Sequence, residues 1–140
     1  MHIDPSFKRI PFPSESSIFY LIVLEKNSSV FPIYVGESNR NVGRLGDYVS
    51  ANFKASTDFK VGRAVRYLME CGHSPVVYYK GSVDRKREQN ELLSELTQNG
   101  FRLLNHLSGY DYRSADEEKE LEKIKKFTDL LIRDFQKFNP

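Results

Sequence analysis

Two short apolar segments near the start of the chain have the composition of β-strands. Residues 17–25 (SIFYLIVLE) and 32–36 (PIYVG) are rich in β-branched and aromatic side chains. The segment 25–31 (EKNSSVF) between them is mostly polar. This pattern predicts a β-hairpin whose loop is longer than the tight two-residue type. A third strand is predicted over residues 74–82 (SPVVYYKGS).

Apolar residues at helical spacing predict four helices, each with a start or stop signal. The predicted helices span residues 41–53, 57–72, 84–100 and 114–138. Asn41 is a good cap for the first, although Gly43 and Gly46 each weaken that helix by up to about 1 kcal/mol. Gly72 and Gly100 are stops for the second and third helices. The fourth is long and amphipathic, with Ser114 as its expected cap. Its apolar positions include Leu121, Ile124, Leu131 and Phe135.

The order of these elements predicts an α/β (α+β) fold: a small central three-stranded sheet, antiparallel or mixed, flanked by helices. We expect residues 1–16, which are rich in proline, to form an N-terminal arm, and residues 17–110 to form the domain. Residues 111–140 add a C-terminal helix. Its apolar stripe predicts that it packs either on the domain or at a homodimer interface.

The composition narrows the classes of protein and of site. Apolar residues make up 39% and charged residues 29% of the 140 residues, an ordinary balance for a folded domain. Cys71 is the only cysteine, which excludes an intrachain disulfide and a zinc site with two or four cysteines. The sequence has no phosphate-binding Gly-Lys-Ser/Thr loop, and the chain has no signal-peptide or membrane-spanning pattern. We therefore expect a cytoplasmic protein that does not associate with membranes.

Positive charge is concentrated in the middle of the chain. Residues 60–87 hold seven basic residues against two acidic ones, although the formal charge of the whole chain is only +2. Such a run is often no more than a solvated face, but it also suits contact with phosphate. The residues expected to bind nucleic acid are Lys60, Arg63, Arg66, Lys80, Arg85 and Arg87.

The hairpin carries a second pattern, made of tyrosines. Tyr20 lies in its first strand and Tyr34 in its second strand, which ends at Gly36. Arg44 follows this glycine by eight residues, and Tyr48 lies one helical turn further on. This arrangement resembles the GIY-YIG nuclease family, in which a hairpin carries two tyrosines and the next helix supplies an arginine.

Later elements extend the resemblance over roughly residues 17–107. A helix ending at Gly72 and the strand PVVYY match the order of elements in the family. The metal-binding glutamate of the family lies on the following helix, where Glu88 precedes Leu92 by four residues, and an asparagine past that helix corresponds to Asn105. The chain departs from the family at Ile18, which replaces a glycine of the signature.

The spacing of the tyrosines leaves one alternative register. Tyr34 follows Tyr20 by fourteen positions, a few more than is usual, and a longer hairpin loop would absorb the difference. A shifted register would put Phe19 in the place of Tyr20 and remove one hydroxyl. Tyr20 is preferred, because FYLIV then matches the aromatic-tyrosine-aliphatic run of the family.

Helix geometry favours Glu88 over Glu91 as the metal ligand. At 100° per residue, Leu92, Leu93 and Leu96 define the buried face of their helix. Glu88 lies at the edge of this face, whereas Glu91 points nearly opposite, into solvent. An edge position lets a carboxylate reach a cleft while the helix stays packed, so Glu91 is only the second choice.

The resemblance implies a metal-dependent endonuclease that hydrolyses DNA; the pattern does not distinguish DNA from RNA. Glu88 would hold one Mg²⁺ or Mn²⁺, a hard cation that accepts a single carboxylate plus waters and phosphate oxygens. Arg44 would stabilise the charge of the transition state and Tyr20 would be the general base. Tyr34 and Tyr48 would position water and phosphate, with Asn105 supporting the site. The rival hypothesis is a non-catalytic module of the same fold that binds nucleic acid or protein.

Overall fold

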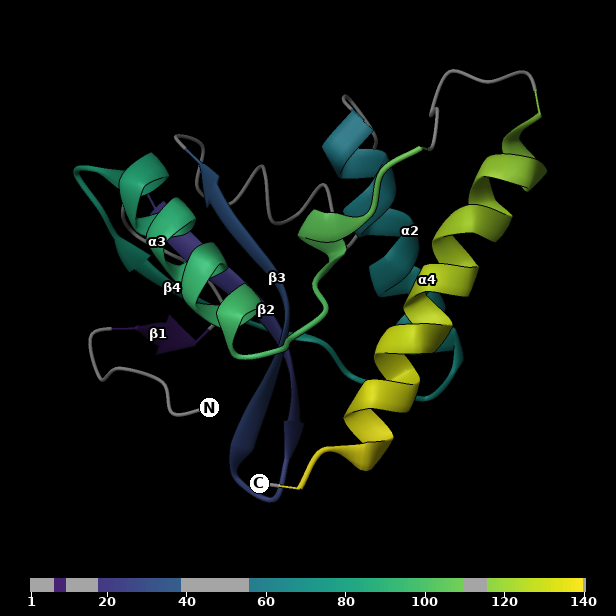
Figure 1. Ribbon diagram of the computed structural model, residues 1–140, viewed down its shortest axis with the longest axis horizontal. Coiled ribbons are helices and arrows are strands. Elements are labelled where there is room, and N and C mark those ends of the chain that lie inside the picture. Colours follow the sequence, from purple (N-terminus) through teal and green to yellow (C-terminus); the bar gives the residue numbers. More distant parts are fainter. Residues whose placement is uncertain (1–6, 10–17, 39–55, 110–115, 140) are drawn as a thin grey trace.

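A computed structural model describes residues 7–9, 18–38, 56–109 and 116–139 of the chain (Figure 1). The described elements are β1 (Lys8–Arg9), β2 (Ile18–Lys26), β3 (Ser29–Ser38), α2 (Ser56–Glu70), β4 (Val76–Gly81), α3 (Arg85–Gln98), the short 3-10 helix η1 (Leu104–His106) and α4 (Glu117–Lys137). An antiparallel sheet is combined with three α-helices, which confirms the predicted α+β class. The helix predicted over residues 41–53 lies outside the described residues.

The sheet has the strand order β1-β4-β2-β3, and every neighbouring pair is antiparallel. β2, β3 and β4 are the three predicted strands. The fourth strand comes from the predicted N-terminal arm, where Lys8 pairs with Tyr79 and Arg9 with Tyr78. Part of the arm therefore belongs to the sheet and extends it by a two-residue edge strand.

The prediction of a long loop between β2 and β3 is wrong. Lys26 pairs directly with Ser29, so that Asn27 and Ser28 alone form the turn, with φ of 52° and 67°. Positive φ at both central residues is the geometry of a tight type I′ turn. One residue of the spacing between the tyrosines is taken up inside the ladder, where the register shifts between Ile22 and Val23 as in a β-bulge.

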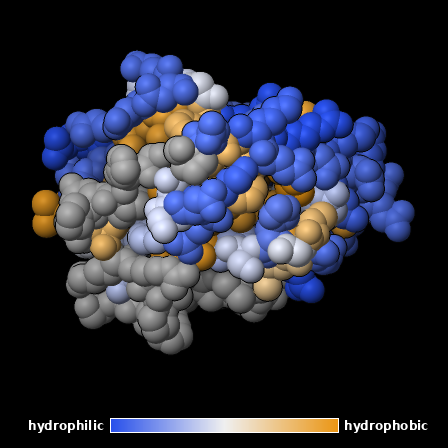
Figure 2. All heavy atoms as spheres, turned by 90° about the horizontal axis from the view of Figure 1, so that it is seen from below, coloured by the Kyte–Doolittle hydropathy of each residue, from blue (hydrophilic) through white to orange (hydrophobic). Residues whose placement is uncertain are grey.

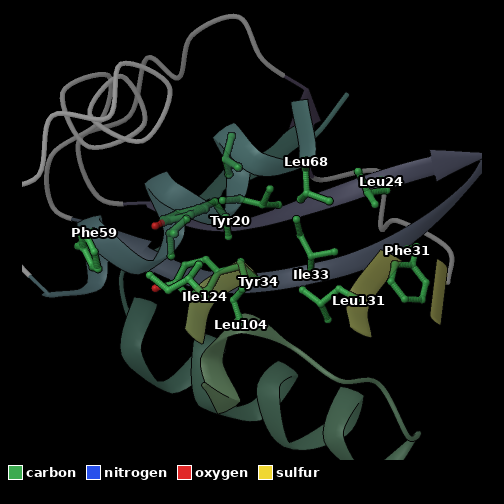
Figure 3. Packing of buried hydrophobic residues seen from close by; sticks show 14 of the residues in the cluster. Tyr20, Leu24, Phe31, Ile33, Tyr34, Phe59, Leu68, Leu104, Ile124 and Leu131 are labelled. Atoms are coloured by element: carbon green, nitrogen blue, oxygen red, sulfur yellow. The ribbon is translucent and has the colours of Figure 1, made fainter. Parts of the chain in front are cut away.

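The two faces of the sheet are covered by different helices (Figure 1). Tyr20, Ile22 and Leu24 point to one face and pack in a single cluster with residues of α2, η1 and α4 (Figure 3). Phe19, Leu21 and Val23 alternate with them and pack with residues of α3. We call these the tyrosine face and the α3 face. The chain is thus a sandwich in which the sheet separates α3 from α2 and α4.

The C-terminal helix packs on the tyrosine face. Ile124 and Leu131 of α4 are fully buried, and Phe135 packs beside them. The helix begins at Glu117, and its cap is Asp116, whose carboxylate accepts a hydrogen bond from the Lys119 backbone N–H at 3.1 Å. The prediction that Ser114 caps this helix is therefore wrong.

The other end of α4 is held by the β-hairpin. Lys26 Nζ donates to the carbonyls of Phe135, Gln136 and Phe138 at 3.4, 3.2 and 3.0 Å. An ammonium group at a helix C-terminus satisfies carbonyls that have no partner within the helix and complements their negative dipole end. Lys26 thus links the turn of the hairpin to the C-terminal end of α4.

The face of the molecule in Figure 2 is mostly polar where the structure describes it. Seen from below, hydrophilic side chains cover most of it, with small hydrophobic areas between them (Figure 2). The exposed large hydrophobic residues of the described part are Met69, Val83 and Leu130. None of its helices combines the length and apolar composition needed to cross a membrane.

Candidate functional site

Tyr20 and Tyr34 lie together on the tyrosine face. Their ring centroids are 6.1 Å apart, with an angle of 45° between the ring planes. Tyr20 is 0% exposed and Tyr34 is 6% exposed. Both side chains run toward the end of the core cluster where Phe59 lies (Figure 3). The hairpin therefore brings the two predicted tyrosines into one cluster.

Gly36 is required by the position of the Tyr20 ring. The two residues pair across β2 and β3. A Cβ atom at Gly36 would lie 2.4 Å from Tyr20 Cζ and 2.5 Å from its hydroxyl oxygen, closer than non-bonded atoms approach. The glycine that ends the Tyr-Val-Gly run thus leaves the space that the other tyrosine fills.

A third tyrosine, which was not predicted, joins this cluster. Tyr79 of β4 pairs with Tyr20 on the side opposite Gly36 and is also buried on the tyrosine face. The alternation of side chains in β4 was the available signal, because it turns Tyr79 and the neighbouring Tyr78 to different faces.

Asn105 fixes the outer edge of the hairpin. Its Oδ1 accepts a hydrogen bond from the Val35 N–H at 3.0 Å, and its Nδ2 donates to the Val35 carbonyl at 2.8 Å. Gln89 of α3 donates to the same carbonyl at 3.3 Å. The amide of Asn105 thereby replaces a neighbouring strand at the residue between Tyr34 and Gly36. The sequence predicted that Asn105 supports the site, and this role stays a prediction; the contact of Gln89 was not predicted.

Glu88 lies on the other face of the sheet. Its Oε2 is 3.2 Å from Lys80 Nζ, and Lys80 pairs across the strands with Phe19, a residue of the α3 face. This oxygen is buried and makes no hydrogen bond within the described part of the chain. The described contacts therefore join Glu88 to Lys80, while the tyrosines belong to the opposite face.

The donor chemistry of Glu88 fits a hard divalent cation. No group of three or more His, Cys, Asp or Glu side chains suited to a metal occurs among the described residues, so Glu88 would act as a single carboxylate. Mg²⁺ accepts such a site by keeping several waters. The ammonium of Lys80 already lies beside the same oxygen. Glu91, the second choice, has a side chain that is 65% exposed and pairs with Arg87 at 3.5 Å.

Two predicted catalytic residues, Arg44 and Tyr48, lie outside the described residues. The described part of the site is thus the hairpin, Glu88 and Asn105.

The basic run of the sequence is divided between the two faces. Its first three residues, Lys60, Arg63 and Arg66, are on α2, which packs on the tyrosine face. Lys60 is only 7% exposed and donates to the Leu107 carbonyl at 3.2 Å, and burial lowers its pKa. Lys60 is therefore not part of an exposed basic surface. Arg63 pairs with Glu117 of α4, whereas Arg66 is exposed.

The other three residues predicted to bind nucleic acid, Lys80, Arg85 and Arg87, lie on the α3 side and have acidic partners. Lys80 pairs with Glu88, and Arg85 Nε lies 2.6 Å from Glu37 Oε2. Arg87 Nε donates to Asp84 at 2.8 Å, and this hydrogen bond raises the pKa of Arg87. A run that is strongly basic in sequence is thus partly neutralised in the fold.

Comparisons with protein families, with curated proteins and with solved structures each found no match for this chain.

Proposed function

We propose that this chain is a metal-dependent endonuclease of the GIY-YIG type that hydrolyses phosphodiester bonds in DNA. The observation that carries the proposal is the mutual fit of Tyr20 and Gly36 across the hairpin, with Tyr34 packed beside them. This fit gives a physical reason for the two halves of the tyrosine-glycine pattern to occur in one chain. The bonds from Asn105 to Val35 support the same segment.

In this proposal the side chains divide the work of hydrolysis. Arg44 directs a fixed fork of N–H donors at the non-bridging phosphate oxygens, where negative charge develops. Tyr20 accepts the proton of the attacking water, and Tyr34 and Tyr48 orient water and phosphate. A phenol has an ordinary pKa of about 10, and a guanidinium nearby favours the phenolate that a base requires. Because Tyr20 is buried, water has to reach its hydroxyl for this role.

Glu88 would hold the divalent cation. When bound, that cation would neutralise phosphate charge and assist the leaving oxygen. Glu88 lies in the first turn of α3, and its side chain is 27% exposed, although Oε2 itself is buried. Gln89, the next residue, bonds Val35 of the tyrosine hairpin, so α3 and the hairpin are joined close to Glu88.

The decisive experiment measures single-turnover cleavage of plasmid DNA in Mg²⁺, with EDTA as the blank and RNA as a second substrate. Arg44→Ala and Glu88→Ala should each lower the rate by at least about 100-fold, as loss of a charge-stabilising group does. Glu91→Ala is the matched control, a glutamate one turn along α3, and should have a mild effect. DNA binding, measured separately in Ca²⁺, should change little. Wild-type rates in both Arg44→Ala and Glu88→Ala would refute the proposal.

A second candidate is a non-catalytic module that binds nucleic acid or protein. Two observations favour it: Tyr20 is fully buried, and Glu88 is already paired with Lys80. It predicts that the wild-type chain binds its partner without cleaving nucleic acid in Mg²⁺ or Mn²⁺. The same assays therefore separate the two candidates.

A further inference from the structure

The contact between Lys80 and Glu88 combines a buried acceptor with a positioned cation. Glu88 Oε2 is shielded from water and has no hydrogen-bond partner in the described part of the chain, and Lys80 Nζ lies 3.2 Å away. Both side chains are 27% exposed. A carboxylate oxygen in such a place is stabilised by a nearby positive charge. Lys80 supplies that charge here.

Two aromatic rings hold the ammonium of Lys80 in place. Its Nζ lies 5.4 Å from the centroid of the Phe7 ring and 5.8 Å from that of the Phe19 ring. The two rings contact each other edge to face, with centroids 5.4 Å apart. Both distances from Lys80 Nζ to a ring centroid are within the range of a favourable cation–π interaction. Lys80 thus contacts both the two rings and Glu88.

This position makes Lys80 a competitor for any cation at Glu88. A divalent ion bound to the carboxylate would be repelled by the ammonium beside it, so Lys80 has to move away from the oxygen. The rings of Phe7 and Phe19 would keep it nearby. One hollow is lined by Lys80 and Arg87 together with the carboxylates of Glu88, Glu91 and Glu95, so a displaced Lys80 still faces a place open to a ligand, and a cation at Glu88 offsets the negative charge of its lining. The freed ammonium can then bind an anionic oxygen.

We propose that Lys80 exchanges Glu88 for a substrate phosphate when a divalent cation binds, so that cation and nucleic acid each strengthen the binding of the other. This inference rests on the proposed function, because it uses Glu88 as the cation ligand. Without nucleic acid, Lys80 weakens cation binding. With nucleic acid present, Lys80 pairs with a phosphate instead of Glu88, and the Glu88 carboxylate becomes available to the cation. By thermodynamic linkage, the gain in affinity is equal in the two directions.

The test is Mn²⁺ binding, measured by electron paramagnetic resonance on the full chain, with and without a short DNA duplex. Lys80→Met keeps an unbranched aliphatic side chain but removes the charge. It should bind Mn²⁺ about tenfold more tightly than the wild type without DNA, within the usual range of coupling between sites. DNA should then add little. Lys80→Arg keeps a cation and should retain weak Mn²⁺ binding that DNA strengthens.

Two controls locate the effect. Lys86→Met removes a positive charge from an exposed position of α3, the helix that carries Glu88, and the Mn²⁺ affinity of this variant should stay within about twofold of the wild type, because exposed charges are screened. Adding Glu88→Gln to Lys80→Met should abolish the tight Mn²⁺ site. Circular dichroism confirms that each variant is folded.

The outcomes separate this inference from the proposed function. If Lys80→Met binds Mn²⁺ no more tightly than the wild type while Glu88→Gln loses it, Glu88 is a cation ligand and the exchange by Lys80 is wrong. If neither the wild type nor Lys80→Met binds Mn²⁺ and the wild type cleaves no DNA, both proposals fall. Tight Mn²⁺ binding by Lys80→Met that requires Glu88 supports the exchange.

Discussion

The two faces of the sheet differ in how their polar side chains are accommodated. On the tyrosine face, the hydroxyl-bearing rings of Tyr20 and Tyr34 are packed in an aromatic and aliphatic core closed by α2 and α4. On the α3 face, charged side chains such as Lys80 and Glu88 lie at a partly open surface in pairs. Neighbours in one strand, such as Tyr79 and Lys80, therefore have opposite surroundings. Alternation along a strand separates two kinds of chemistry by the thickness of a sheet.

The faces meet at the outer edge of β3. The Val35 carbonyl accepts hydrogen bonds from Asn105 of η1 and from Gln89 of α3. The first donor comes from a helix whose Leu104 packs in the core of the tyrosine face, the second from the helix that carries Glu88. If both faces contribute to one reaction, this edge is where their groups approach each other. The following experiments test the division into faces, from the largest expected effect to the smallest.

Tyr20→Phe should separate a chemical role of the buried hydroxyl from a packing role. As general base, the hydroxyl accounts for at least about 100-fold in the single-turnover cleavage rate. The free energy of unfolding should fall by only about 1 kcal/mol, because the ring stays in place. Tyr78→Phe is the matched control: its hydroxyl belongs to the α3 side, where it donates to Glu25 at 2.9 Å. Equal cleavage by both variants and the wild type would make Tyr20 a packing residue.

Gly36→Ala should destabilise the tyrosine face by steric overlap. The new methyl group would meet Tyr20 Cζ at 2.4 Å inside a closed core, and overpacking of this kind costs about 3 kcal/mol. Gly72→Ala is the comparison: it has φ of +88° but no atom within 4 Å of the new methyl, so only about 1 kcal/mol is expected. Urea denaturation measures both. In a Tyr20→Val background, Gly36→Ala should cost clearly less, because the overlapping ring is gone.

Asn105→Ala should loosen the edge where the faces meet. It leaves the Val35 N–H without its side-chain acceptor and should lower the free energy of unfolding by about 2 kcal/mol. Gln89→Ala removes a longer bond to a carbonyl that Asn105 still serves, so about 0.5 kcal/mol is expected. Hydrogen exchange at the Val35 amide should accelerate in the first variant and not in the second. Equal exchange rates would mean that the edge does not depend on Asn105.

The smallest expected effect concerns the buried ammonium of Lys60. Burial lowers its pKa in the folded state, so between that lowered pKa and the ordinary value of about 10.4 the unfolded chain binds more protons at this position. Lys60 therefore makes the free energy of unfolding rise with pH in this window, and the contribution is lost as the pH falls through the lowered pKa. Lys60→Met should therefore reduce the increase of the free energy of unfolding with pH. Urea titrations from pH 7 to pH 10 measure it, and an unchanged slope would contradict the assignment.

Local signals predicted most of the fold. The apolar runs placed β2 and β4, and the stops at Gly72 and Gly100 were right because both glycines adopt the positive φ, 88° and 86°, that ends a helix. The hairpin turn was predicted too long because Asn27-Ser28 lacks the glycine that usually marks a type I′ turn. The β1 strand escaped prediction because a two-residue pairing depends on tertiary contact rather than on its own sequence.

The candidate site was less predictable than the fold. Alternation alone does not put Tyr20 and Tyr34 on one face. The register shift between Ile22 and Val23 pairs Tyr34 with Ile22, a residue of the tyrosine face, and this shift was not predicted. Which face α3 covers is decided by the path of the chain between elements, so the pairing of Glu88 with Lys80 could not be read from spacing. The charge run likewise hid acidic partners distant in sequence, such as Glu37 for Arg85. Burial of Lys60 had no signal beyond its place on the packed side of α2.

The hydrogen bonds from Lys26 to the end of α4 have a consequence for the order of folding during synthesis. Its three carbonyl partners follow it by 109 to 112 residues, so this contact cannot form until nearly all of the described chain has been made. The hairpin, β4 and α3 are available much earlier, and contacts of large sequence separation form late because closing a long loop costs entropy. Until α4 docks, the tyrosine face exposes the apolar surface that Ile124 and Leu131 later cover. A φ-value near zero for Leu131→Ala would place the docking of α4 after the folding transition state. Before α4 docks, the exposed apolar surface makes the nascent chain most prone to aggregation.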